Sequence, residues 1–210
     1  MEVNRIILLS SKGDELTAKF IKTSFNFHLI RTKEELVIFE FNKSDVLLSY
    51  NTNVIVPIDI IQNVYLAVNV HAASPDFPGR DPHHWAIYRK AKEYGATLHF
   101  MTEKVDHGKI IKTELFNVKN DDTPYTLLKK ADDYALKIID WFLIELKKQI
   151  TFDSLNINWG EFKTNRKDML KLFDLSEVDE NEMNIRRKAF YSPIYKNLYF
   201  KKYGFIFYMD

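Results

Sequence analysis

Short apolar runs alternate along the chain with segments of helical periodicity. Residues 5–10, 45–49 and 64–70 are short apolar runs, typical of strands buried on both faces. Residues 96–101 and 109–118 also look like strands. The helix candidates have apolar positions at helical spacing: 14–25, 58–62 and 84–93. Strands separated by helical segments predict an α/β fold, with a mainly parallel sheet flanked by helices.

The longest helical pattern runs from Tyr125 to Lys148. Its apolar stripe recurs every three or four residues, at Leu128, Ala131, Ala135, Ile138, Phe142 and Leu146. A helix of that length would measure roughly 36 Å, enough to cross a sheet. Beyond it the chain alternates charged and aromatic segments. We therefore predict a main domain over residues 1–150 and a C-terminal extension, helical and with a β-hairpin, over 151–210.

The last 21 residues carry nine aromatic side chains. One interpretation is a small hairpin that packs on the core. The other is a set of rings that lines a ligand site or a dimer contact, because exposed aromatic residues concentrate at interfaces.

Composition excludes several classes of protein. Thirty basic against 29 acidic residues give a net charge of +1, so no general field attracts nucleic acid or an anionic membrane. The chain has no Cys, which excludes disulfides, thiolate zinc sites and cysteine nucleophiles and suits a reducing compartment. The longest apolar run, 138–144, is too short to span a bilayer, and the four apolar residues 6–9 are a poor signal peptide. We expect a soluble cytoplasmic protein.

Candidate chemistry gathers in residues 71–107, which hold five of the six histidines and three of the six prolines. Rigid turns with titratable groups at strand ends are how an α/β sheet usually builds a site. Ordinary surface histidines are one alternative. A metal site from His71, His83, His84 and Asp106 is another, disfavoured because adjacent histidines tend to point apart and no His-x-x-x-His pair occurs. Gly-x-Ser-x-Gly, Gly-x-Gly-x-x-Gly and P-loop motifs are absent.

Three motifs in this region carry a resemblance. They are Asn-Val-His at 69–71 before a loop rich in Pro and Gly, Gly-Ala-Thr-Leu-His-Phe at 95–100, and Asp-His-Gly-Lys-Ile-Ile at 106–111. In this order and spacing they resemble the signature of the formyltransferases that use N10-formyltetrahydrofolate. The resemblance implies a Rossmann-like formyltransferase fold and an enzyme whose co-substrate is N10-formyltetrahydrofolate, without a metal.

The resemblance also implies a catalytic trio, Asn69, His71 and Asp106. The chemistry suits these groups, because Asn69 and a protonated His71 can donate hydrogen bonds to a developing oxyanion. A His can relay the protons, with Asp106 orienting and charging it. By the same matching the pterin would be held, largely by backbone groups, at two turns: Val54, Ile55, Val56, Lys104 and Val105. An ordinary buried strand end explains 54–56 equally well.

The C-terminal extension narrows the family. Trp-Gly at 159–160, Lys-Thr-Asn-Arg-Lys-Asp at 163–168 and Arg-Arg-Lys-Ala-Phe at 186–190 resemble the sugar N-formyltransferases. Lys188 and Asn165 depart from that pattern, which puts details of nucleotide binding in doubt. The methionyl-tRNA enzymes carry a basic C-terminal barrel and the formyltetrahydrofolate hydrolases a regulatory domain, neither of which is expected here. Glycinamide ribonucleotide formyltransferase has a Gly/Ser-rich loop that residues 10–13 match poorly.

We therefore expect an enzyme that formylates the amino group of a dTDP-linked 4-amino-4,6-dideoxysugar, as a step in the synthesis of lipopolysaccharide O-antigen. The competing hypotheses are glycinamide ribonucleotide formylation, a metal-dependent hydrolase, and a module that binds nucleotide without turnover. The expected contacts to the nucleotide sugar are Ser10, Lys12, Arg80, Asp81, His84, Lys163 and Arg166, each also explicable as a surface or turn residue. The family and the aromatic tail favour a homodimer, with no nucleic-acid or membrane partner.

Overall fold

The computed structural model describes residues 3, 5–12, 16–17, 20, 25–148, 151–192 and 194–209. Its elements are β1 (Arg5–Leu9), β2 (Asn26–Ile30), α2 (Lys33–Ile38), β3 (Asp45–Tyr50), α3 (Ile58–Gln62), β4 (Leu66–His71), α4 (Pro82–Tyr88), β5 (Glu93–Phe100), β6 (Ile110–Asn117), α5 (Pro124–Lys148), α6 (Arg166–Lys171), α7 (Glu180–Phe190), β7 (Tyr199–Lys202) and β8 (Phe205–Tyr208).

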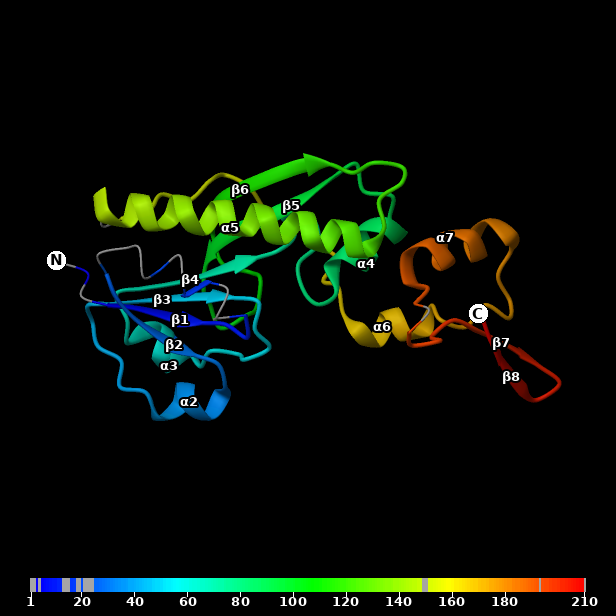
Figure 1. Cartoon of the computed structure of the whole chain (residues 1–210), viewed down its shortest axis with the longest axis horizontal. Coiled ribbons are helices and arrows are strands. Elements are labelled where there is room, and N and C mark those ends of the chain that lie inside the picture. The colour runs from blue at the N-terminus through cyan, green and yellow to red at the C-terminus, as the bar shows by residue number, and fades with distance from the viewer. Residues whose placement is uncertain are drawn as a thin grey trace.

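The main domain is built on a six-stranded sheet in the order β2-β1-β3-β4-β5-β6 (Figure 1). The first four strands are parallel, and β5 and β6 are antiparallel additions at one edge. The predicted α/β class is confirmed, and the sheet is mixed. The chain turns back after β4 through the loop of residues 72–81 and the short helix α4, so β5 pairs directly with β4 in the opposite direction.

Two elements, β2 and α2, were not predicted from the sequence. β2 lies at the sheet edge and alternates between exposed and covered positions, so it has no continuous apolar run. The expected helix over 14–25 falls largely outside the described residues. Leu16 and Phe20, two of its apolar positions, are fully buried.

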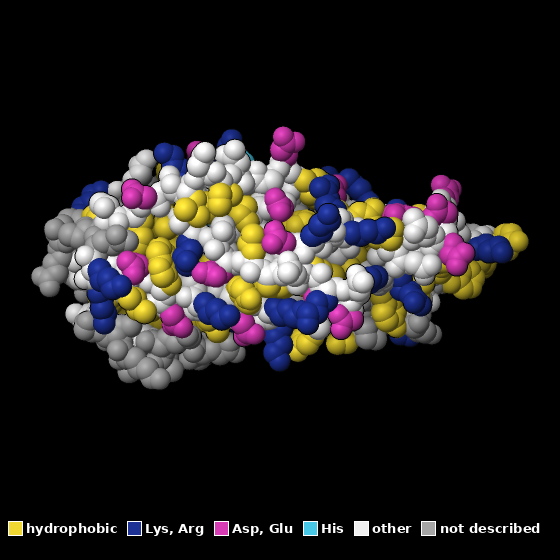
Figure 2. Space-filling view, turned by 90° about the horizontal axis from the view of Figure 1, so that it is seen from above, with side chains coloured by type: hydrophobic (Ala, Val, Ile, Leu, Met, Phe, Trp, Pro, Cys, Tyr) yellow, Lys and Arg dark blue, Asp and Glu magenta, His cyan; other side chains and the backbone are white. Residues whose placement is uncertain are grey.

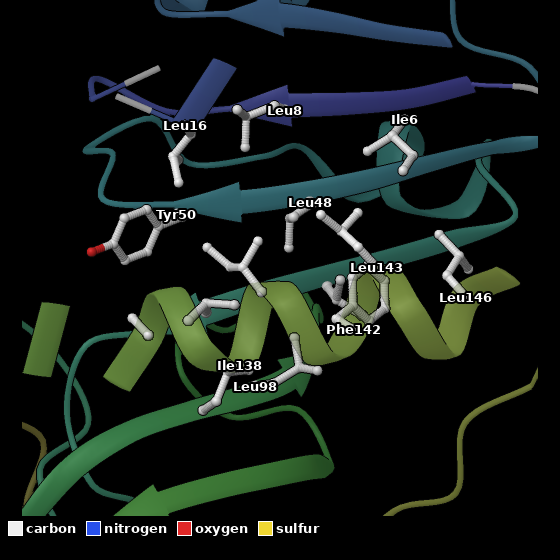
Figure 3. Packing of buried hydrophobic residues seen from close by; sticks show 14 of the residues in the cluster. Ile6, Leu8, Leu16, Leu48, Tyr50, Leu98, Ile138, Phe142, Leu143 and Leu146 are labelled. Carbon is white, nitrogen blue, oxygen red and sulfur yellow. The ribbon is translucent and has the colours of Figure 1, made fainter. Parts of the chain in front are cut away.

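Helices cover both faces of the sheet, and successive residues of β1 serve opposite faces. Ile6 and Leu8 belong to the cluster under α5, together with Phe142 and Leu146 of that helix (Figure 3). Ile7 and Leu9 belong to the cluster on the other face, with residues of α2 and α3 packed there. Burial on both faces is why the central strands are continuous apolar runs.

A third cluster joins the C-terminal extension to the main domain. Trp85 of α4 and Leu127 of α5 are buried together with Met169 of α6 and Phe190 of α7. Figure 1 shows α6 and α7 beyond the end of the sheet, while α5 runs along the sheet. The extension therefore shares its apolar core with the helices that flank the cleft described below.

The aromatic tail forms the antiparallel hairpin β7–β8. Leu198, just before it, is buried, but every residue of β8 is exposed, Phe205 at 67% and Tyr208 at 56%. The hairpin was expected correctly, but its packing on the core is limited to its base. Figures 1 and 2 place it at the end of the molecule farthest from the sheet, with apolar side chains at the tip. Among the described helices, none combines the length and apolar character needed to cross a membrane.

Candidate active site

A cavity of about 690 Å³ lies at the carboxyl ends of β3 and β4. Its walls come from the loops that follow β3, β4 and β5 and from the segment before α6. Asn69, His71 and Asp106 all line it, so the fold brings the three predicted catalytic residues together. The position matches the general rule that an open α/β sheet binds ligands beyond the carboxyl ends of its strands.

The amide of Asn69 is oriented by a residue across the sheet. Asn69 and His99 are direct partners in the pairing of β4 with β5. Nδ1 of His99 lies 2.8 Å from the Phe100 carbonyl, so it donates there. The Asn69 amide nitrogen lies 3.1 Å from Nε2 of His99, which accepts from the amide whenever that ring nitrogen carries no proton. The second N–H of that amide remains available to a ligand.

His71 is held by its backbone surroundings. Its Nε2 donates to the carbonyl of Phe77 at 3.0 Å, which leaves Nδ1 as the nitrogen that can take up a proton. Nδ1 lies 3.8 Å from Oδ2 of Asp106. A proton gained at His71 would therefore be stabilised by the carboxylate.

Asp106 is a buried carboxylate surrounded by groups that favour its charge. The Gly79 N–H donates to Oδ2 at 2.9 Å, and Nε2 of His99 lies 3.5 Å from Oδ1. Burial by itself would raise the pKa of Asp106. The charge of His71, the contacts with His99 and the Gly79 hydrogen bond outweigh it and lower the pKa to about 2. The carboxylate is therefore ionised at neutral pH.

The turns expected to hold the pterin form one wall of the cavity. Val54, Ile55 and Val56 line it from the loop after β3, and Lys104 and Val105 line it from the loop after β5. Ile55 is 66% exposed, which argues against the simple buried strand end. Apolar side chains on this wall fit the faces of a flat heterocycle.

Three of the expected sugar contacts also line the cavity: Arg80, Asp81 and Lys163. Nζ of Lys163 donates to the Val105 carbonyl at 3.1 Å and so spans the cavity rim. Oδ2 of Asp81 is buried and accepts no hydrogen bond from the described residues. The guanidinium of Arg166, which is outside the cavity lining, lies 3.6 Å from that oxygen.

The other four expected contacts, Arg166 among them, do not line the cavity. Ser10 is fully buried at the end of β1. Lys12 pairs with Asp132 at 2.7 Å, and Asp132 lines the cavity while also accepting from Tyr50. His84 is turned away and donates from Nδ1 to the carbonyl of Ala189.

His83 lines the cavity where His84 was expected. Burial, and then the neighbouring His84, lower the pKa of His83 to about 3, and burial also lowers that of His84. Both rings are therefore neutral at neutral pH and offer hydrogen bonds rather than positive charge. Among the described residues, no three His, Asp or Glu side chains gather as a metal site requires.

The sequence reasoning missed His99, Asp132 and Trp159 as parts of the site. His99 belongs to the motif at 95–100, so that motif was the signal for it. Trp159 lies behind His99 and His71, with ring centroids 4.9 and 6.0 Å away. No local pattern pointed to Asp132, which lines the cavity from the N-terminal half of α5.

Comparisons with known proteins agree with this geometry. The formyl transferase family matches residues 37–140. The bifunctional polymyxin resistance protein ArnA of Wigglesworthia glossinidia brevipalpis is 28% identical over 148 residues, which are 69% of this chain and 23% of that protein. The formyltetrahydrofolate deformylase of Synechocystis is 28% identical over 138 residues, 61% of this chain and 49% of that one. The chain thus spans less than half the length of these curated relatives.

Solved structures share the fold over nearly the whole chain. A 4-N formyltransferase from Francisella tularensis superposes with a TM-score of 0.80 at 19% identity, covering 100% of this chain and 97% of that one. An N-formyltransferase from Helicobacter canadensis, in complex with folinic acid and dTDP-3-aminofucose, gives 0.67 at 17% identity, with 97% and 85% covered. The formyltransferase PseJ from Anoxybacillus kamchatkensis, in complex with a UDP-linked formamido sugar and tetrahydrofolate, gives 0.64 at 22% identity, with 87% and 97% covered.

The family match covers the sheet from α2 onward and includes all three residues of the predicted trio. The structural likeness extends the same fold through the C-terminal extension. The motifs at 69–71, 95–100 and 106–111 meet in one cavity of that fold. The chain therefore belongs to the formyl transferase family.

Proposed function

We propose that the protein transfers a formyl group from N10-formyltetrahydrofolate to the amino group of a nucleotide-linked aminosugar. The observation that carries this proposal is the convergence of Asn69, His71 and Asp106 on one cavity. In this proposal residues 54–56 and 104–105 hold the folate, and Arg80, Asp81 and Lys163 contact the nucleotide sugar.

Each member of the trio has a definite part in the proposed reaction. As the acceptor nitrogen bonds to the formyl carbon, the free N–H of the Asn69 amide donates to the formyl oxygen, where negative charge develops. Nδ1 of His71 takes the proton that the amine loses and returns it to N10 as the bond between carbon and N10 breaks. Asp106 stays ionised and stabilises the protonated His71. These residues move protons and orient groups, while the folate supplies the one-carbon unit.

We propose a dTDP-linked 4-amino-4,6-dideoxysugar as the acceptor and O-antigen synthesis as its place. The structural neighbour from Helicobacter canadensis is in complex with dTDP-3-aminofucose, whereas PseJ holds a UDP sugar. The nucleotide base therefore differs among the structural neighbours, and the choice of dTDP belongs to this proposal. Asp81 supports a polar acceptor, because its buried Oδ2 can accept a hydrogen bond from a sugar hydroxyl or amine. Arg166 and Lys163 supply positive charge for a diphosphate nearby.

Two further parts of the proposal concern the setting. The absence of Cys and the use of folate and nucleotide sugars favour the cytoplasm. The exposed apolar hairpin favours a homodimer, because contiguous apolar surface on a protein marks an interaction site.

The test offers formyltetrahydrofolate with each amine in parallel and follows folate release. We expect turnover with a dTDP-4-amino-4,6-dideoxysugar, and a rise in melting temperature with dTDP alone, because a ligand selective for the folded state stabilises it. UDP-linked aminosugars and 3-amino sugars serve as the matched comparisons. Turnover with glycinamide ribonucleotide, and with no nucleotide aminosugar, would replace the proposal by the purine assignment.

A further inference from the structure

The chain between α5 and α6 crosses the two loops that carry the catalytic groups. We call residues 155–165 the strap. The N–H of Leu155 donates to the Ile110 carbonyl at 2.7 Å, and that of Gly160 donates to the Pro75 carbonyl at 2.9 Å. The strap thus bonds to the chain on both sides of the cleft, after β5 and after β4.

Its far end closes on the loop after β4. The N–H of Thr164 donates to the Pro78 carbonyl at 2.7 Å, and the Arg80 N–H donates to the Thr164 carbonyl at 3.0 Å. Gly79 lies between these two bonds, and its own N–H holds Asp106. The strap therefore determines where one donor to the catalytic carboxylate lies.

Trp159 connects the strap to the other side of the carboxylate. Its indole Nε1 donates to the Gly108 carbonyl at 2.8 Å, two residues beyond Asp106. Its ring packs edge-on against His99, with centroids 4.9 Å apart and planes at 90°, and against His71 at 6.0 Å and 62°. Trp159 does not line the cavity itself, so it would act through these residues.

We propose that Trp159 is a positioning residue of the active site. Asp106 has a left-handed backbone, φ 51°, and the loop around it needs anchors outside itself. The bond to Gly108 anchors the loop, and the edge-on indole limits how the rings of His99 and His71 can turn about χ2, a torsion that is otherwise broad. His99 in turn orients the Asn69 amide. This inference rests on the proposed formyl transfer.

The test compares Trp159→Phe with Trp159→Leu, and uses Trp141→Phe as the matched control. Trp141 lies on α5 and packs against Phe152, away from the cavity. Trp159→Phe keeps a ring against the imidazoles and loses the N–H. We expect a fall of about tenfold in kcat, with KM for both substrates within about twofold, and a larger fall in Trp159→Leu. The acidic limb of the profile of kcat against pH should move in both Trp159 variants and stay in place in Trp141→Phe.

Melting temperatures separate positioning from folding. If the fall in kcat of the Trp159 variants only matches the loss of folded protein, the inference is wrong. It is also wrong if Trp159→Phe keeps the kcat and the pH profile of the wild type. A change mainly in KM also contradicts it, because Trp159 would then shape binding.

A second readout needs no turnover. A protonated imidazole quenches a neighbouring indole, and among the described tryptophans only Trp159 has recorded ring contacts with histidines. We expect a pH-dependent step in tryptophan fluorescence that survives Trp141→Phe and disappears in Trp159→Phe. If the wild type transfers no formyl group to any acceptor, the proposed function fails. In that case the fluorescence step still tests the placement of Trp159 beside the histidines. Its presence supports the placement, and its absence overturns it.

Discussion

At the scale of single residues, Asn69 is the clearest test of the proposed chemistry. Asn69→Ala removes one oxyanion donor and should lower turnover by roughly 10²–10³, about 2.7–4 kcal/mol. His71→Asn should cost more, because it also removes the group that moves the proton. Steady-state kinetics with melting curves measure both, and Asn117→Ala, at an exposed position of β6 outside the cavity, is the matched control. Near-normal turnover in a folded Asn69→Ala protein would remove Asn69 from the mechanism.

His83 makes the stability of the protein depend on pH. Its pKa is about 3 in the folded protein against an ordinary value of 6.5, chiefly because burial disfavours the charged ring. Between those values the unfolded chain takes up a proton that the folded protein does not, so stability falls as pH falls. From pH 7 to pH 5 we expect a loss of about 2 kcal/mol from this group, or roughly 4–8 °C in melting temperature.

His83→Gln should reduce that slope, and His107→Gln, at an exposed position, should leave it unchanged. A residual slope of the same sign is expected from His84, whose pKa burial also lowers. Equal slopes in the wild type and in His83→Gln would show that His83 titrates normally.

At the scale of elements, the loop after β4 and the strap approach too closely for any side chain at Gly79. A Cβ there would lie 2.1 Å from the Thr164 carbonyl oxygen, and φ is +108°. Gly204 in the turn of the β7–β8 hairpin also has a positive φ, +81°, but no atom within 4 Å of its Cβ position. Both glycines therefore have a backbone conformation that other residues rarely adopt, but only at Gly79 would a side chain also clash with neighbouring atoms.

Gly204→Ala should cost about 1 kcal/mol of unfolding free energy, from its backbone alone. Gly79→Ala should cost about 3 kcal/mol or more, because overpacking adds to strain. It should also lower turnover in the protein that remains folded, since the Gly79 N–H holds Asp106. Denaturant unfolding measures both variants. A similar loss of unfolding free energy in the two variants would mean that the strap can move away from a side chain at position 79 with little strain.

At the scale of the whole molecule, the projecting hairpin is the feature that a single copy leaves uncovered. Ile206 and Phe207 of β8 are 51% and 54% exposed, and Figure 2 shows apolar side chains at the projecting end of the molecule. We expect the wild type to be a dimer. The double variant with Ile206→Lys and Phe207→Lys should be a 24.9 kDa monomer, because the free energy needed to bury two charges in an apolar contact exceeds the free energy that the contact contributes. Size exclusion with light scattering at two concentrations measures this.

Ile38→Lys is the matched control, since Ile38 is 80% exposed on α2 at the opposite end of the molecule. It should leave the dimer intact. A wild-type protein that is monomeric at both concentrations, or a dimer that survives the hairpin changes, would show that the tail has another role.

The sequence by itself determined the elements that are buried along their whole length. β1 and β3 were predictable because strands covered on both faces need unbroken apolar runs, and α5 because its stripe recurs at helical spacing. The trio was found through motifs that each fall within six consecutive residues. Edge strand β2 and helix α2 were missed because half-exposed elements carry a weak pattern.

Only the tertiary structure decided how distant residues meet. The antiparallel pairing of β4 with β5 sets Asn69 beside His99, and the strap brings Trp159 behind His71 and His99 across 60 to 90 positions of chain. His84 turned inward to Ala189, and His83 took its place in the cavity, because packing against α7 decides which ring of an adjacent pair is covered. Contacts of this kind depend on register and packing between elements, and no local spacing in the sequence encodes them.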